Sequence, residues 1–224
     1  MRRPTLTAAA TLLVALLAAN AALSEPASYR IDKNHSSVSF KIRRLFSKVP
    51  GRFNDFSGTI QYDDKSLANS AVDVTIQTAS IFTNQDFRDK DLRSPNFFDA
   101  EKFPTLTFKS TKIVPGKDNQ FQIVGDLTMH GVTKPVTLDA EFLGGGAVGM
   151  GTDRQSTQAG FDATVTIDRK EWGINWNQAL DNGGALLDDK VLIELTIEAI
   201  KEQPKESAAA TDPPKPPPPS SVKK

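Results

Sequence analysis

The chain has 224 residues and no cysteine, which excludes a disulfide framework, a thiolate nucleophile and a cysteine-ligated zinc site. Its 27 basic and 27 acidic residues balance, and residues 25–200 alone carry a slight excess of carboxylates, which is atypical of a nucleic-acid-binding protein. That middle part is long enough for one domain with a substantial core.

Both ends of the chain are predicted to lie outside this domain. Arg2 and Arg3 precede an apolar run over residues 6–19 and the small-residue pattern Ala19-Asn20-Ala21. This layout is typical of a secretory signal peptide, and the run is shorter than the roughly 18 residues of a membrane-spanning helix. We therefore expect residues 1–24 to direct export and to be removed, and the Pro- and Lys-rich residues 201–224 to form a disordered tail.

Within residues 25–200, apolar and polar side chains alternate with a period of two. The clearest alternating segments are residues 38–42, 72–76, 105–109, 136–142, 161–168 and 191–197. Turn residues such as Pro115-Gly116 and His130-Gly131 separate them. Such a pattern predicts about eight antiparallel strands, each with one apolar face, and an all-β sandwich or barrel.

Residues 84–100 break the alternation. Phe87, Leu92, Phe97 and Phe98 could cap one end of the sheet from one or two short helices, and Ser94-Pro95 would end the first of them because proline disfavours a helical residue before it. We expect a short helical insertion that covers the end of a barrel.

The apolar strand faces are uniform enough to line a ligand tunnel, but a tightly packed core would show the same pattern, so both interpretations stay open. The tunnel hypothesis names these candidate lining residues: Val38, Phe40, Ile42, Val74, Ile76, Leu106, Phe108, Val136, Leu138, Phe142, Val165, Ile167 and Trp176. Trp176 could instead plug the barrel.

Several stretches resemble the YceI-like, or polyisoprenoid-binding, family of exported bacterial proteins. They occur in the family's order, at residues 29–36 (YRIDKNHS), 50–58 (PGRFNDFSG), 88–108, 125–136 (GDLTMHGVTKPV) and 160–174. The resemblance implies an eight-stranded antiparallel, lipocalin-like barrel with a long apolar tunnel. It also implies binding of isoprenoid quinones, polyprenyl compounds or other amphiphiles in the periplasm.

Four polar residues have two interpretations each. Arg88 and Arg169 could contact an anionic headgroup, since a guanidinium suits phosphate, or could form structural salt bridges and caps. His35 and His130 could hold a metal with a carboxylate, but turn chemistry explains both, and we expect no metal. No Gly-x-Ser-x-Gly elbow exists in the sequence, so we expect no catalytic residues and no enzyme.

These observations favour a periplasmic binding or carrier protein whose partner is an apolar small molecule or lipid. We expect no cofactor beyond a bound isoprenoid quinone or polyprenyl lipid as ligand, no nucleic acid and no stable membrane insertion. A homodimer stays open. The alternatives are a ligand-free structural or stress-response barrel and a lipid-modifying enzyme.

Overall fold

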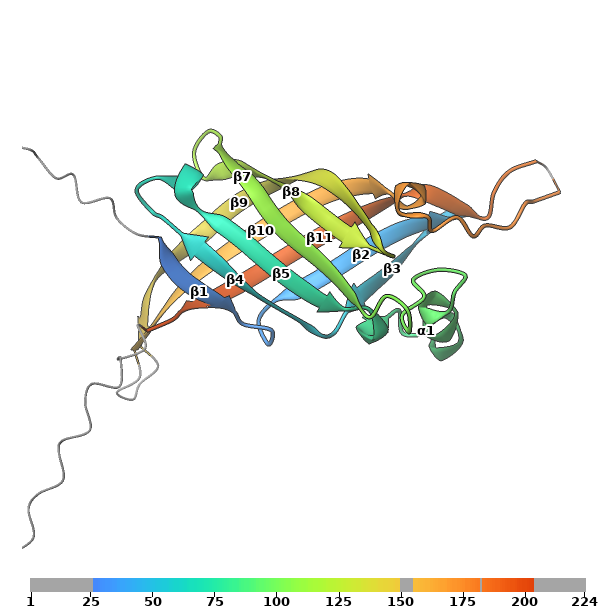
Figure 1. Ribbon diagram of the computed structural model, residues 1–224, viewed down its shortest axis with the longest axis horizontal. Coiled ribbons are helices and arrows are strands. Elements are labelled where there is room, and N and C mark those ends of the chain that lie inside the picture. Colours follow the sequence, from blue (N-terminus) through green and yellow to red (C-terminus); the bar gives the residue numbers. More distant parts are fainter. Residues whose placement is uncertain (1–25, 150–154, 182, 204–224) are drawn as a thin grey trace, which may run out of the picture.

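A computed structural model describes residues 26–149, 155–181 and 183–203, and these residues form an elongated barrel (Figure 1). The predicted signal peptide and nearly all of the predicted tail lie outside the described residues. The elements are β1 (Ala27–Ile31), β2 (Ser37–Arg44), β3 (Ser47–Phe53), β4 (Phe56–Tyr62), η1 (Leu67–Asn69), β5 (Ala71–Gln77), η2 (Thr78–Ser80), β6 (Ile81–Phe82), α1 (Asp86–Arg93), β7 (Thr105–Pro115), β8 (Gln120–Met129), β9 (Val132–Gly149), β10 (Gln155–Asp168), η3 (Arg169–Trp172) and β11 (Leu187–Lys201).

Eight strands close the barrel. Antiparallel pairing runs in the order β1-β4-β5-β7-β8-β9-β10-β11, and β11 pairs with β1 to complete the ring. Closure leaves no free edge along this wall. The all-β class and the eight-stranded antiparallel barrel are therefore confirmed.

The strands β2, β3 and β6 extend the wall at one end. One edge of β11 pairs with β1 over residues 199–201 and with β2 over residues 187–196, so β1 and β2 act as one strand interrupted by a turn. Likewise β3 passes into β4 at Asn54-Asp55, two exposed residues at which the apolar alternation changes phase. The barrel wall bends at these interruptions, as it commonly does at bulges.

The helical insertion follows β6 and lies at the same end of the barrel (Figure 1). Helix α1 ends at Arg93, directly before Ser94-Pro95, as the sequence predicts. The buried carboxylate of Asp89 fixes the helix by accepting hydrogen bonds from the backbone N–H and the hydroxyl of Thr83. The buried Phe97, after the helix, contacts the ring of Trp176 at a centroid distance of 5.1 Å.

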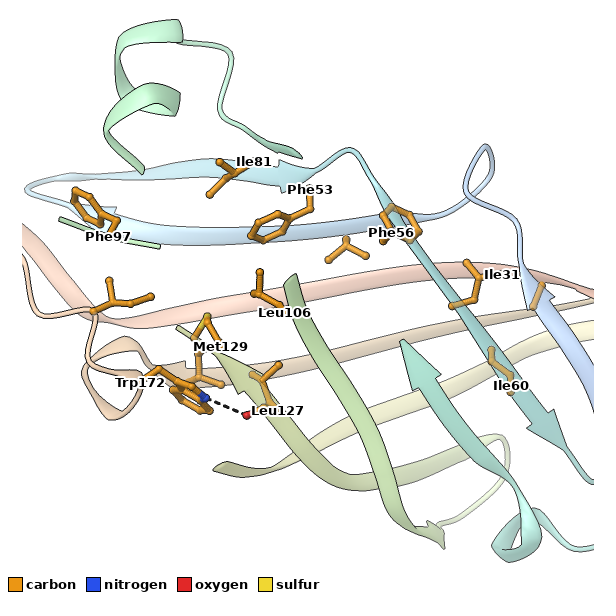
Figure 2. Close-up of a cluster of buried hydrophobic side chains, with 14 of the residues drawn as sticks. Ile31, Phe53, Phe56, Ile60, Ile81, Phe97, Leu106, Leu127, Met129 and Trp172 are labelled. Atoms are coloured by element: carbon orange, nitrogen blue, oxygen red, sulfur yellow. Dashed lines mark hydrogen bonds between the residues drawn. The ribbon is translucent and has the colours of Figure 1, made fainter. Parts of the chain in front are cut away.

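Buried apolar side chains gather in two clusters. The larger one includes Phe53, Ile81, Phe97, Leu127 and Trp172, and most of its labelled members in Figure 2 come from strands around the α1 end. The smaller one gathers at the other end, where β7 turns into β8; it comprises Ile113, Phe121, Ile123, Leu138, Ala140 and Ala163. The wall between these clusters encloses the candidate site.

Among the described residues, no helix is long and apolar enough to cross a membrane.

Candidate functional site: an apolar cavity in the barrel

The barrel interior holds a cavity of about 810 Å³. Its wall is almost wholly apolar and receives side chains from the strands all around the barrel as well as from the α1 insertion. The volume falls in the range of roughly 300–1,000 Å³ that is typical of small-molecule sites. The interior is therefore hollow, which decides between the two interpretations that the sequence left open.

Nearly every predicted tunnel residue lies on this wall. The residues that line the cavity are Val38, Phe40, Ile42, Val74, Ile76, Leu106, Phe108, Val136, Leu138, Val165, Ile167 and Trp176. Phe142 points inward, as its alternation indicates, but does not line the cavity; it packs behind the floor of the cavity.

Aromatic rings form that floor. Tyr62 reaches from β4 to the rings of Phe142 on β9 and Phe161 on β10, at centroid distances of 5.6 and 5.7 Å. Phe161 also contacts Phe121 edge-on. Burial raises the pKa of the Tyr62 hydroxyl, so this ring stays neutral. The rings lie toward the η1 end, where Leu67 and Ser70 also line the cavity. The exposed lining residues Arg44, Ser47, Gln85 and Phe87 all lie at the α1 end, which indicates that a ligand enters there.

Two glycines keep the cavity open along its length. A Cβ atom added at Gly51 would lie 2.3 Å from the ring of Phe40, and one added at Gly125 would lie 2.5 Å from the ring of Phe108. Both rings can lie flat against the wall because the glycines offer no side chain there. The alternation marks Phe40 and Phe108 as inward residues but does not reveal this packing.

The mouth of the cavity lies between the β2–β3 hairpin, α1 and the loop segments around Trp176 and Leu186. Arg44 and Ser47 line it from the hairpin, Gln85 and Phe87 from the insertion, and Leu186 from the loop before β11. On the side of β8, β9 and η3, side chains fill the same end of the barrel. There Trp172, with 1% of its surface exposed, donates a hydrogen bond to the carbonyl of Leu127 (Figure 2).

Arg88 lies at the mouth but is already engaged. Its guanidinium donates to the hydroxyl and the carbonyl of Thr83, at 2.7 and 2.8 Å, and so anchors α1 to the residue that follows β6. The side chain still lines the cavity. A headgroup contact by Arg88 stays a prediction, and it would add to a structural role.

Arg169 is engaged more completely. Only 3% of its surface is exposed, and it donates to the carbonyls of Ile174, Trp176 and Asp188 and to the carboxylate of Asp189. Burial lowers the pKa of its guanidinium, while the neighbouring carboxylates oppose this shift. These contacts hold Trp176 against the cavity. The headgroup contact predicted for Arg169 stays a prediction. The hydrogen bonds of Arg169 indicate that it positions the loop that carries Trp176.

Sequence reasoning missed several lining residues. Phe53, Phe97 and Phe98 add aromatic surface near the mouth, where edge-to-face contacts join Phe53 and Phe98. Arg44 was missed because the alternating pattern was assigned only as far as Ile42, whereas β2 continues for two more residues. Arg44 is an exposed cation on the cavity rim and a better candidate for a headgroup contact than Arg169.

The two histidines lie outside the cavity lining. His130 occupies the β8–β9 turn, where its Nδ1 lies 3.0 Å from the carbonyl of Trp172. His35 pairs with Asp32 at 2.7 Å, and together with Glu198 these residues bring three ligand atoms within 4.8 Å of one another. Within the described residues this is the one group that could hold a metal ion. The ion pair itself accounts for the arrangement of the turn between β1 and β2.

Comparison with known proteins places this barrel in a family. The family model described as YceI-like domain matches residues 29–199. The chain belongs to the YceI-like family. A UPF0312 protein of Vibrio parahaemolyticus is 42% identical to this YceI-like protein over 154 residues, which cover 67% of this chain and 79% of that protein.

Two solved structures share the fold. BcnA of Burkholderia cenocepacia is 24% identical with a TM-score of 0.66, over 75% of this chain and 98% of that one. A polyisoprenoid binding domain from Saccharophagus degradans is 15% identical with a TM-score of 0.57, over 79% of this chain and 99% of that one. At these identities the likeness shows the barrel fold.

Proposed function

We propose that this YceI-like protein binds the long apolar chain of a polyisoprenoid, an isoprenoid quinone or a fatty-acyl amphiphile and carries it through the periplasm. The observation that supports it most is the hollow barrel: an apolar cavity of about 810 Å³, floored by aromatic rings and open beside α1. The Saccharophagus degradans domain named for polyisoprenoid binding has the same fold, which supports the ligand class by analogy.

The stabilisation of such a complex would come from burial. Each Å² of apolar surface removed from water contributes roughly 25 cal/mol. A flexible apolar chain inside the barrel needs no specific hydrogen bonds, so the apolar wall sets the ligand class. Polar groups at the mouth, such as Arg44 and Arg88, set the orientation of the ligand.

The alternatives have less support. A solid structural barrel would fill its centre with side chains, whereas this centre is hollow. A lipid-modifying enzyme would need acid–base groups at the ligand. His35 and His130 do not line the cavity, and among the described residues Asp91 and Asp162 are the only carboxylates in its lining. Export rests on the signal-peptide pattern of residues 1–24.

Native mass spectrometry of the protein purified from its own host tests the proposal. We expect a species heavier than the chain by the mass of one lipid, which extraction with organic solvent removes. Only ligand-free mass, together with no binding of apolar dyes or quinones to the purified protein, would show that the proposal is wrong.

A matched pair of variants tests where the ligand lies. Val165→Trp fills the cavity from β10, and we expect it to weaken binding of an apolar dye at least about tenfold. Thr164→Trp changes the neighbouring residue, whose exposed side chain points out of the same strand, and should leave binding unchanged. Equal effects of the two variants would contradict binding inside the barrel.

A further inference from the structure

The β2–β3 hairpin ends in two apolar residues where a tight turn usually has polar ones. Arg44 pairs with Ser47 across the hairpin, so Leu45 and Phe46 make up the turn. Two-residue hairpin turns favour Asn and Gly because they require positive φ. Leu45 has a φ of 51°, an unfavourable value for a bulky side chain. This turn therefore has a sequence that its own backbone does not favour.

Large apolar side chains are exposed at this tip and beside it. Phe46 is fully exposed, and Phe87 of α1 has 83% of its surface exposed. Phe87 itself lines the mouth of the cavity, whereas Phe46 lies just outside it, in the turn between the lining residues Arg44 and Ser47. Leu45 ties the tip to the rest of the mouth by donating its backbone N–H to the carbonyl of Leu186.

Three basic residues lie within three positions of Phe46 in the hairpin. Arg43 and Lys48 are register partners and lie directly opposite each other on the hairpin, an arrangement in which like charges repel. Arg44 adds a third cation. Across the described residues, no carboxylate forms an ion pair with any of the three.

The positive φ of Leu45 and the repulsion between Arg43 and Lys48 both destabilise the hairpin. In the described part of the fold, no ion pair compensates for that repulsion. Conflicts of this kind indicate a function for the residues that cause them. An aromatic ring among cations matches the surface of an anionic bilayer, in which rings settle at the headgroup level and basic side chains contact phosphates.

We propose that residues 43–48 together with Phe87 form a membrane-docking face for an anionic phospholipid surface. Phe46 enters the interface, and Arg43, Arg44 and Lys48 contact lipid phosphates. The face flanks the mouth on the sides of the hairpin and α1, so docking directs the cavity toward the bilayer and lets an apolar chain pass without crossing bulk water. The inference rests on the proposed carrier function, but its surface can be tested separately.

Vesicle flotation tests the face with a matched control. We expect the protein to float with vesicles of phosphatidylcholine and phosphatidylglycerol and to bind pure phosphatidylcholine much less. Phe46→Ser should reduce binding about tenfold, since one buried aromatic ring is removed. Leu143→Ser removes another exposed apolar side chain, 54% exposed in the distal part of β9 at the opposite end of the barrel, and should change nothing.

The variant Lys48→Glu separates membrane binding from folding. The introduced carboxylate would face Arg43, so the hairpin should unfold at a higher temperature than in the native protein, while binding to anionic vesicles should fall several-fold. In Phe46→Trp, tryptophan emission should shift to shorter wavelength when anionic vesicles are added. A role confined to the hairpin's stability predicts no spectral shift and no loss of flotation.

Dye binding in solution distinguishes a failure of this inference from a failure of the carrier function. Phe46 does not line the cavity, so Phe46→Ser should bind an apolar dye as the native protein does. Normal dye binding without flotation, or equal flotation of Phe46→Ser and Leu143→Ser, would overturn the docking face and leave the carrier function intact. Flotation with vesicles, without any dye or lipid bound inside the cavity, would overturn the carrier function and leave the docking face intact.

Discussion

Two halves of the same barrel end are built in opposite ways. On the side of β8, β9 and η3, the side chains fill the barrel: Trp172 is buried and hydrogen-bonded to Leu127, and Arg169 gathers the carbonyls of the following loop. On the side of β2, β3 and α1, Phe46 and Phe87 are exposed and the cavity opens. A barrel can therefore stay hollow if one part of it is packed and fully hydrogen-bonded.

This contrast predicts where substitutions are costly. In the plugged half, every removed atom leaves a void or an unpaired polar group. Along the hollow wall, a shortened side chain only enlarges a space that already exists. Loss of stability and loss of binding should therefore separate by position.

Trp172→Ala should have the largest effect. It removes a large side chain that is 1% exposed, together with its hydrogen bond to the carbonyl of Leu127, so we expect a loss of about 3–5 kcal/mol in the free energy of unfolding. Urea titration followed by circular dichroism measures it. A loss below that of the cavity-wall variant Phe108→Ala would contradict the packed plug.

Arg169→Lys should come next. A lysine keeps the charge but cannot reach the carbonyls of Ile174, Trp176 and Asp188 together, and we expect a loss of about 2–3 kcal/mol. Because this network holds Trp176 at the cavity, dye affinity should fall as well. A stable variant that loses affinity only for a lipid with an anionic headgroup, and not for an apolar dye, would instead favour the headgroup contact expected from the sequence.

Phe108→Ala tests the hollow wall. A fully packed phenylalanine costs about 3–5 kcal/mol when truncated, but Phe108 already faces the cavity, so a loss of about 1–2 kcal/mol is expected. Dye affinity should change more than stability. A loss as large as that of Trp172→Ala would show that the ring packs as tightly as a solid core requires.

Period-two alternation predicted the strand faces because side-chain direction is a local property of a strand. It placed Val38, Phe108 and Val165 inward, and the structure agrees. It could not reveal the hollow, since inward apolar residues look alike whether they meet across a core or line a space. Phe142 shows the limit: it points inward but lies behind the aromatic floor.

The polar residues of the mouth were harder to predict, because their partners are set by tertiary structure. The sequence places Arg169 at the end of a strand, but the neighbouring residues do not predict that the carbonyls of a loop accept its hydrogen bonds. Phe46 follows two arginines and looks like the end of a strand, whereas it forms the turn of a hairpin. Resemblance to the family supplied the closure of the barrel, which alternation alone left undecided between a barrel and a sandwich.

The turn between β1 and β2 should give the smallest effect, and it depends on pH. The hydrogen bond between His35 and Asp32 raises the pKa of the histidine above 6.5 and lowers that of the aspartate below 3.8. The histidine's contribution to stability is complete below its unfolded pKa and is lost as pH rises through its folded pKa. The aspartate's contribution is present above its own unfolded pKa and is lost as pH falls through its folded value.

Stability from this pair should therefore peak between those two unfolded values and decline toward alkaline pH. Urea midpoints measured at about pH 5.5 and about pH 8.5 should differ more for the native protein than for His35→Gln, which lacks the ion pair. The difference should be small, because the histidine is exposed to solvent. An identical pH dependence in the two proteins would show that the pair adds nothing to the turn, and that the hydrogen bonds between Ser36 and Glu198 hold β2 beside β11 without it.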